Sequence, residues 1–227
     1  MRFVTILSLA FLLLAPANGF GKNTKSKTRL TLLNNSKTNG VEKVEAKEPL
    51  EKPIKRVLIV FYSWDENTER AAYLITRCLP KKGRFKILFT SCKIKLENDY
   101  TNDFDLCIAQ AKKDISKKVK PAISNVPSDV SAYDIVFLGS PIWWDTIAPP
   151  LLSFTEIMKD YRGPVAPFFT RGSSGLGNCM KDLKEALPKA RIQHAGFFSG
   201  KRLGDHDELE ELFVKEWAKE ILNLNVN

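Results

Sequence analysis

Short apolar runs alternate with helical patterns from residue 54 onwards. Arg56–Tyr62 and Tyr133–Gly139 are almost continuous runs of β-branched and aromatic residues, which is typical of strands buried on both faces. Between such runs, apolar positions recur at helical spacing. The pattern predicts strands at Arg56–Tyr62, Phe85–Thr90, Tyr133–Gly139, Pro164–Phe169 and Arg191–Phe198, and helices at Thr68–Leu79, Phe104–Val119, Pro149–Tyr161, Cys179–Leu187 and Asp205–Leu222.

Strands interleaved with helices predict an α/β fold, a doubly wound five-stranded parallel sheet covered on both faces. In the last helix, we expect Asp205 to be the N-cap and Glu208 its capping-box partner. The apolar stripe of that helix is predicted to be Leu209, Leu212, Phe213, Trp217 and Ile221. In such sheets, ligands bind beyond the carboxyl ends of the strands, so the loops after strands one, three and four are expected to carry function.

The N-terminus has the features of a targeting segment. Residues 3–15 form an apolar run that is too short for a permanent membrane span, and small residues follow it, so residues 1–19 are predicted to be a cleaved signal peptide. Residues 20–53 are polar and charged, and are predicted to be a disordered linker or a transit-like segment. We therefore expect either export to the periplasm or exterior, or delivery to a secondary plastid through a bipartite leader. Residues 54–227 form the predicted domain.

Charge argues against a nucleic-acid protein. The 227 residues have a net charge of +9, but residues 1–56 hold 11 Lys and Arg against 4 Asp and Glu. Residues 57–227 hold 24 against 22, so the predicted domain is nearly balanced. A basic binding groove is not expected, and no membrane contact is expected after signal cleavage.

Four cysteines, at positions 78, 92, 107 and 179, allow either two disulfides or four free thiols, and we favour free thiols. None of them has metal-ligand spacing, so no metal site is predicted. The two histidines lie away from the Gly- and Ser-rich loop, which makes a hydrolase the weakest of the functional hypotheses.

Three loops carry the candidate chemistry. Ser63–Thr68 leads directly into a helix, and free N–H groups at a helix start attract anions. Ser140–Pro150 contains the adjacent Trp143 and Trp144, and one exposed indole there is a stacking platform for a planar ring. Thr170–Asn178 is rich in Gly and Ser, so its backbone can approach a ligand edge.

These loops resemble those of the flavodoxin family, in a bacterial branch that carries a PIWW loop at the position of Pro141–Trp144. The resemblance covers residue 54 to the end and implies the strand order 2-1-3-4-5 with one FMN bound noncovalently. It implies that Ser63, Asn67 and Thr68 face the phosphate, that Trp143 and Trp144 flank the isoalloxazine, and that Thr170, Gly172, Ser173 and Gly175 line the pyrimidine edge. Pro141, Asp145 and Thr146 complete the implied FMN-binding set.

Four residues depart from the family pattern. Asp65 and Glu66 stand where the phosphate turn has a small hydroxyl residue and a glycine, and their charges weaken or abolish FMN binding if they face the phosphate. Asp145 replaces a glycine beside the flavin, and Arg171 replaces a histidine. Their charges act on the reduction potential in opposite directions.

Two functions follow from the resemblance. The first is an FMN-binding redox protein, either an electron carrier or a small FMN-dependent reductase, which needs no catalytic side chain because the cofactor carries the chemistry. Its partner would be a redox protein or a small-molecule acceptor, and we expect a monomer. The alternative is a flavodoxin-fold domain that has lost FMN and acts as a binding or scaffold module.

Overall fold

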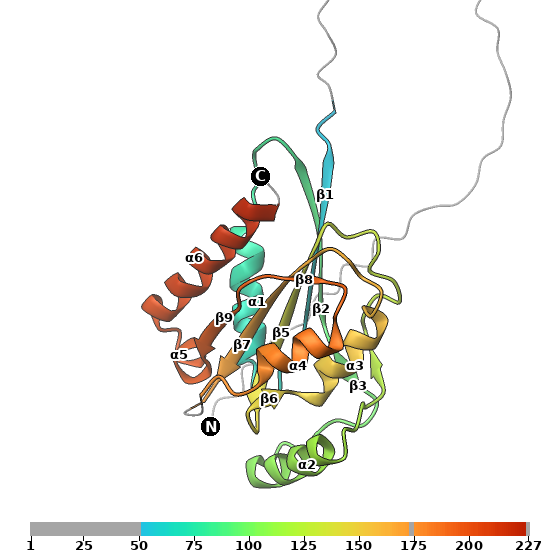
Figure 1. Ribbon diagram of the computed structural model, residues 1–227. Helices are drawn as coiled ribbons and strands as arrows, with labels where there is room; N and C mark the ends of the chain where they lie inside the picture. The colour runs from blue at the N-terminus through green and yellow to red at the C-terminus, as the bar shows by residue number, and fades with distance from the viewer. Residues whose placement is uncertain (1–50, 173–174, 226–227) are drawn as a thin grey trace, which may run out of the picture. The chain divides into compact units, whose positions relative to one another are not determined.

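A computed structural model describes residues 51–172 and 175–225. The predicted signal peptide and nearly all of the segment 20–53 lie outside the described residues. The sheet has the order β2-β1-β5-β7-β8, with all neighbours parallel, which is the 2-1-3-4-5 order implied by the family resemblance (Figure 1). Its strands are β1 (Ile54–Phe61), β2 (Lys86–Lys93), β5 (Ile135–Trp143), β7 (Pro164–Arg171) and β8 (Arg191–Ile192).

Four short strands complete the sheets. β9 (Gly196–Ser199) also pairs with β7 in parallel, so that β8 and β9 share the fifth position. β6 (Thr146–Ile147) folds back antiparallel onto the end of β5. β3 (Lys95–Leu96) and β4 (Ile123–Ser124) form a separate antiparallel pair. The helices are α1 (Asn67–Cys78), α2 (Phe104–Ser116), α3 (Pro149–Ile157), α4 (Cys179–Ala186), α5 (Gly200–Gly204) and α6 (Glu208–Asn225).

Alternate residues of the central strands enter two cores, one on each face of the sheet. Val57, Ile59 and Phe61 of β1 pack in one core with side chains of α1 and α6. Leu58 and Val60 enter the other core, with side chains of α3 and α4. Figure 1 shows α1 and α6 on one side of the sheet and α3 and α4 on the other, so burial on both faces accounts for the continuous apolar runs.

Two predictions for the C-terminal part are wrong. The strand expected over Arg191–Phe198 is broken at residues 193–195, where the His194 carbonyl accepts a 3.3 Å hydrogen bond from the Trp217 indole. The last helix begins at Glu208, and its start is capped by Asp207, which accepts from the Glu210 N–H at 2.9 Å. Asp205 instead follows the short α5, and His206 at φ 57° separates the two helices.

The apolar stripe of α6 is also only partly buried. Trp217 and Ile221 are in the core as expected, whereas Leu209, Leu212 and Phe213 are about half exposed. Glu210 is buried in their place, because its carboxylate pairs with Arg202 and accepts from the Ser199 N–H. Because the Glu210 carboxylate is paired, it can be buried, and the buried face of the first turns of α6 differs from the predicted apolar stripe.

The four cysteines, all within the described part of the chain, are free thiols, as expected. Cys107 and Cys179 are buried, and burial raises the pKa of both thiols, that of Cys179 to about 12. Among the described residues, no helix combines the length and the apolar character needed to span a bilayer.

Candidate functional site

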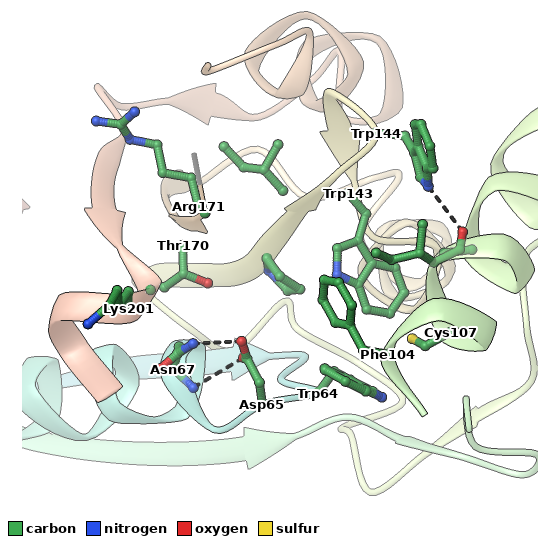
Figure 2. A pocket seen from close by; sticks show the side chains of 16 residues that line it. Trp64, Asp65, Asn67, Phe104, Cys107, Trp143, Trp144, Thr170, Arg171 and Lys201 are labelled. Carbon is green, nitrogen blue, oxygen red and sulfur yellow. Dashed lines mark hydrogen bonds between the residues drawn. The ribbon is translucent and has the colours of Figure 1, made fainter. Parts of the chain in front are cut away.

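A cavity of about 660 Å³ lies where the carboxyl ends of β5 and β7 meet the start of α1. Its lining comes from the β1–α1 loop, α2, the β5–β6 segment, the end of β7 and α5 (Figure 2). This volume suits a cofactor-sized ligand, and the position is the one at which doubly wound sheets bind ligands. The three loops singled out in the sequence therefore converge, and α2 and α5 add walls that the sequence did not indicate.

The two adjacent indoles of the cavity have different environments. Trp143 is partly buried and meets Tyr62 and Tyr100 edge-on, at centroid distances of 5.6 and 5.0 Å. Trp144 is 48% exposed, and its indole N–H donates to the Ile108 carbonyl of α2 at 3.1 Å (Figure 2). One indole is thus anchored in the core while the other remains accessible at the cavity, as a stacking surface requires.

Trp144 and Asp145 form the two-residue turn between β5 and β6. Both have positive φ angles, 49° and 60°, which matches the type I′ turn that short hairpins prefer but which non-glycine residues rarely adopt. The turn is held from outside, because the Asp145 carbonyl accepts from the Asn178 N–H at 2.6 Å. The Thr146 hydroxyl in addition hydrogen-bonds to Asp182 of α4. Contacts to α4 thus fix the strained turn.

Gly177 makes that contact possible. It has φ 53°, and a Cβ placed on it would lie 2.1 Å from the Asp145 carbonyl oxygen. By contrast, Gly172 and Gly175 have open space where a Cβ would stand. The glycine that the geometry requires in this loop is therefore Gly177, which the sequence did not single out.

An aromatic pair from the β1–α1 loop and α2 adds a wall that sequence reasoning missed. Trp64 and Phe104 lie 6.1 Å apart between ring centroids, and both line the cavity. The Trp64 indole donates to the Thr101 carbonyl at 3.0 Å, which ties the β1–α1 loop to the segment before α2. Trp64 is part of the loop predicted to bind phosphate, and an aromatic side chain in that loop was the one sequence feature that could have pointed to this wall. Cys107 and Ile108 of α2 continue this wall.

The tip of α1 already holds acceptors from its own chain. The Asp65 carboxylate accepts from the Asn67 backbone N–H at 3.4 Å and from the Asn67 side-chain amide at 2.6 Å. The Ser63 hydroxyl accepts from the Glu69 N–H at 3.2 Å. Glu66, at φ 65°, accepts from the Arg70 N–H through its carbonyl. Asp65 lines the cavity, so one of the two carboxylates in question does face the site.

The predicted site residues divide into three groups. Those that line the cavity are Asn67, Pro141, Trp143, Trp144, Thr170 and Gly172. Those that do not line the cavity are Ser63, Thr68, Asp145, Thr146 and Gly175. Ser173 lies outside the described residues. Of this second group, Thr68 is fully buried, and its hydroxyl lies 2.6 Å from that of Thr170, which does line the cavity.

Comparison with models of known protein families shows to which family the chain belongs. A family model described as flavodoxin matches residues 57–221, which is nearly the whole described domain. The chain belongs to the flavodoxin family. No curated protein matches this chain.

Solved structures of flavoproteins share its fold. A flavoprotein from Lactobacillus acidophilus NCFM, in complex with FMN, is 24% identical to this chain, with a TM-score of 0.55 over 66% of this chain and 97% of that one. A candidate flavoprotein from Bacteroides uniformis ATCC 8492 is also 24% identical, with a TM-score of 0.56 over 73% of this chain and 98% of the other. At these identities the likeness supports the fold alone.

Proposed function

We propose that this flavodoxin binds FMN in the cavity between α1, α2 and the β5–β6 turn, and works as a redox protein, either an electron carrier or a small FMN-dependent reductase. The observation that carries the proposal is the pair of adjacent indoles, Trp143 and Trp144, at the carboxyl end of β5 in a cavity of about 660 Å³. Family membership and the FMN complex of the Lactobacillus flavoprotein support it.

The aromatic end of the cavity fits a flavin ring. Trp144 offers a half-exposed indole, over which the Lys112 ammonium lies 4.4 Å from the ring centroid, and Trp143 and Phe104 supply further apolar surface in the same cavity. Flat aromatic surfaces at fixed positions stack a planar heterocycle and exclude water from it. Thr170 and Gly172 lie across the cavity on the β7 side, where a hydroxyl and a backbone N–H can bond to the ring edge.

The other end of the cavity carries charges of both signs. Asp65 brings a carboxylate, and Arg171 and Lys201 bring two cations. Positive charge in the lining attracts an anion and the carboxylate repels it, so the lining as a whole is compatible with the phosphate of FMN.

Bound FMN would supply the electron-transfer chemistry at its ring. The side chains of this flavodoxin then have binding and shielding roles. α2 closes one wall through Cys107 and Ile108, and the Trp64–Thr101 and Trp144–Ile108 hydrogen bonds hold α2 in place. We propose that the protein is a monomer and that its partner is a redox protein or a small-molecule acceptor.

The alternative function is a binding or scaffold module that has lost FMN. The specific observation in its favour is the Asp65 carboxylate on the N–H of Asn67, at the helix tip that the family resemblance assigns to the phosphate. The hydrolase hypothesis has no comparable support, because neither histidine lines the cavity.

Purification distinguishes the two functions. An FMN-binding redox protein is expected to be yellow, or to quench its tryptophan fluorescence with 1:1 stoichiometry when FMN is added, and to release FMN on denaturation. A colourless protein whose fluorescence does not respond to FMN contradicts the redox proposal and leaves the scaffold function.

We also propose that residues 1–19 direct export, with delivery to a secondary plastid as the alternative. The apolar run of residues 3–15 and the acid-poor stretch after it support this. N-terminal sequencing of the mature protein tests it, because an intact N-terminus would contradict cleavage.

A further inference from the structure

Trp144, the half-exposed indole of the cavity, is held by two contacts from α2. Its indole N–H donates to the Ile108 carbonyl at 3.1 Å (Figure 2), and the Lys112 ammonium lies over its ring, 4.4 Å from the centroid. Ile108 and Lys112 are four positions apart, so they lie on the same side of α2, one turn from each other. The indole is therefore fixed at its N–H edge and on one face.

The Lys112 side chain has no acidic partner that competes for its charge. Within the part of the chain that the structure describes, its contact with the Trp144 ring is the one interaction of the ammonium group. An ammonium within about 6 Å of an indole centroid is attracted by the negative face of the ring. The contact is thus a favourable one, formed by a lysine that is otherwise exposed to solvent.

The Lys112 side of the indole does not belong to the cavity. Trp144 and Trp143 line the cavity, whereas Lys112 does not. The backbone adds a third restraint, because Trp144 and Asp145 form a turn with positive φ angles that the Asn178 N–H holds through the Asp145 carbonyl. A planar ligand in the cavity would meet an indole whose orientation is already set.

We propose that Lys112 is a positioning residue of this site, which fixes the Trp144 indole and places a positive charge behind the surface on which a flavin stacks. The proposal rests on the proposed flavin-binding function. A flavin ring gains negative charge when it is reduced, and a nearby cation stabilises that charge. Lys112 therefore favours the reduced flavin over the oxidised one.

The first measurement needs no flavin. Hydrogen exchange at the Trp144 indole N–H, followed by NMR on the ¹⁵N-labelled full chain, reports how firmly the indole is held on Ile108. Lys112→Met keeps an unbranched apolar side chain and removes the charge, so we expect exchange at Trp144 to become about twofold faster or more. The indole N–H of Trp217, which donates to a carbonyl elsewhere, is the internal reference and should not change.

The matched control is Lys113→Met. Lys113 is also exposed and follows Lys112 on the same helix, but it points about 100° away around the helix axis. It should leave exchange at Trp144 unchanged. Lys112→Arg keeps a cation that can lie over an indole, so it should restore the wild-type rate.

The second measurement separates the charge from the packing. The ratio of the dissociation constants of oxidised and reduced FMN is obtained from the midpoint potentials of free and bound flavin, at pH 8 and low ionic strength. A loss of packing weakens both forms alike and leaves the ratio unchanged. Loss of the charge weakens the reduced form more, so we expect Lys112→Met to lower the ratio about threefold or more, and high salt to shrink the difference. Lys112→Arg and Lys113→Met should keep the wild-type ratio.

The outcomes distinguish this inference from the proposed function. Unchanged exchange at Trp144 in Lys112→Met overturns the positioning role, whether or not flavin binds. If FMN binds and Lys112→Met keeps the wild-type ratio, or Lys113→Met changes it equally, the role of the charge is overturned and the proposed function stands. If no flavin binds, the proposed function and the role of the charge both fail, and the exchange measurement still decides the positioning role.

Discussion

The side-chain hydroxyls of Thr68 and Thr170 lie 2.6 Å apart, although 102 positions separate the two residues in the sequence. Both side chains are buried, and their hydrogen bond joins the first turn of α1 to the end of β7. The bond thereby fixes two of the three cavity loops relative to each other, which gives these residues a positioning role beside any contact with a ligand.

Replacing one partner of this bond should destabilise the fold. Thr170→Val leaves the Thr68 hydroxyl buried without its partner, so we expect the free energy of unfolding to fall by about 1–3 kcal/mol. Thr68→Val should cost a similar amount, and the double variant less than the sum of the two, because neither hydroxyl is then left unpaired. Urea denaturation measures all three. Strictly additive losses would show that the two hydroxyls are not coupled.

The two adjacent tryptophans should separate binding from stability. Trp144→Ala removes a half-exposed indole, so we expect little loss of stability, under about 1 kcal/mol, but a loss of FMN affinity of about tenfold or more. Trp143→Ala should cost about 2–3 kcal/mol of stability, since Trp143 packs edge-on against Tyr62 and Tyr100. Thermal unfolding and flavin titration measure the two effects. An unchanged FMN affinity in Trp144→Ala would contradict the stacking role.

Gly177 should tolerate no side chain. Gly177→Ala places a Cβ against the Asp145 carbonyl at a positive φ, so we expect a loss of about 2 kcal/mol or more, together with loosening of the β5–β6 turn. The matched control is Gly175→Ala, where nothing lies within 4 Å of the added methyl group. The control should change stability by less than about 1 kcal/mol. Equal losses in both variants, measured by denaturation, would refute the contact.

Glu66 precedes α1 with φ 65° and no side-chain cap hydrogen bond. A non-glycine residue pays about 1–2 kcal/mol for this conformation. Glu66→Gly relieves the strain, but the greater conformational freedom of the unfolded chain lowers the free energy of unfolding by about 0.4–1 kcal/mol. We therefore expect a net gain in stability of up to about 1 kcal/mol. Glu66→Ala keeps the strain and removes the charge, so it serves as the control and should show no comparable gain.

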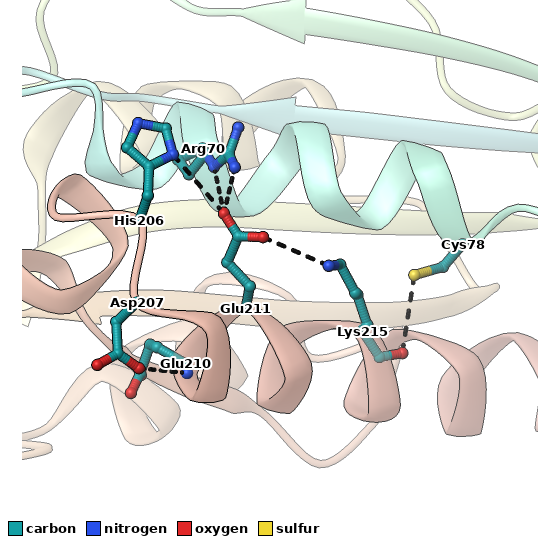
Figure 3. Close-up of polar contacts among 7 residues, drawn as sticks. All are labelled: Arg70, Cys78, His206, Asp207, Glu210, Glu211 and Lys215. Atoms are coloured by element: carbon teal, nitrogen blue, oxygen red, sulfur yellow. Dashed lines mark hydrogen bonds and ion pairs between the residues drawn. The ribbon is translucent and has the colours of Figure 1, made fainter.

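The ion pair between Arg70 and Glu211 should make stability depend on pH. Figure 3 shows Glu211 of α6 receiving contacts from Arg70 of α1, from Lys215 and from His206. The Arg70 hydrogen bonds hold the pKa of Glu211 below its ordinary value. Because the folded-state pKa is depressed, the pair stabilises the fold above the unfolded pKa of about 4.3, and this contribution is lost as the pH falls through the folded pKa.

Glu211→Gln should therefore lower stability at pH 7 by about 1–3 kcal/mol, and the difference from wild type should narrow below about pH 4. Glu216→Gln is the control, because its pair with Lys219 is more than half exposed and should matter by less than about 1 kcal/mol. Urea denaturation over a range of pH measures the difference. A difference that stays constant between pH 7 and pH 3 would contradict the pair's contribution.

The strands of the sheet were predicted well, because burial on both faces requires an uninterrupted run of apolar residues. Val57–Phe61 and Ile135–Leu138 are buried on both faces, and a strand in that position must be apolar throughout. The elements at the edges were predicted less well. In α2, the apolar Leu106 is largely exposed, while Cys107 and Ala111 are buried.

In the candidate site, loop positions were predictable but side-chain contacts were not. The carboxyl ends of parallel strands meet at one edge of the sheet, so Trp144 and Thr170 could be placed together before the structure was known. The contact of Trp64 with Phe104 and that of Gly177 with Asp145 could not be predicted, because such contacts depend on how separate loops pack.

The sequence by itself determined the doubly wound sheet, its strand order through the family resemblance, and the three loops that surround the cavity. The sheet and the loops follow from local periodicity and from chain connectivity, both of which are properties of the sequence. The tertiary structure alone decided that Asp65 turns onto the N–H groups of Asn67. The direction of a charged side chain depends on which donors lie within reach, and those donors come from elements that only folding brings together.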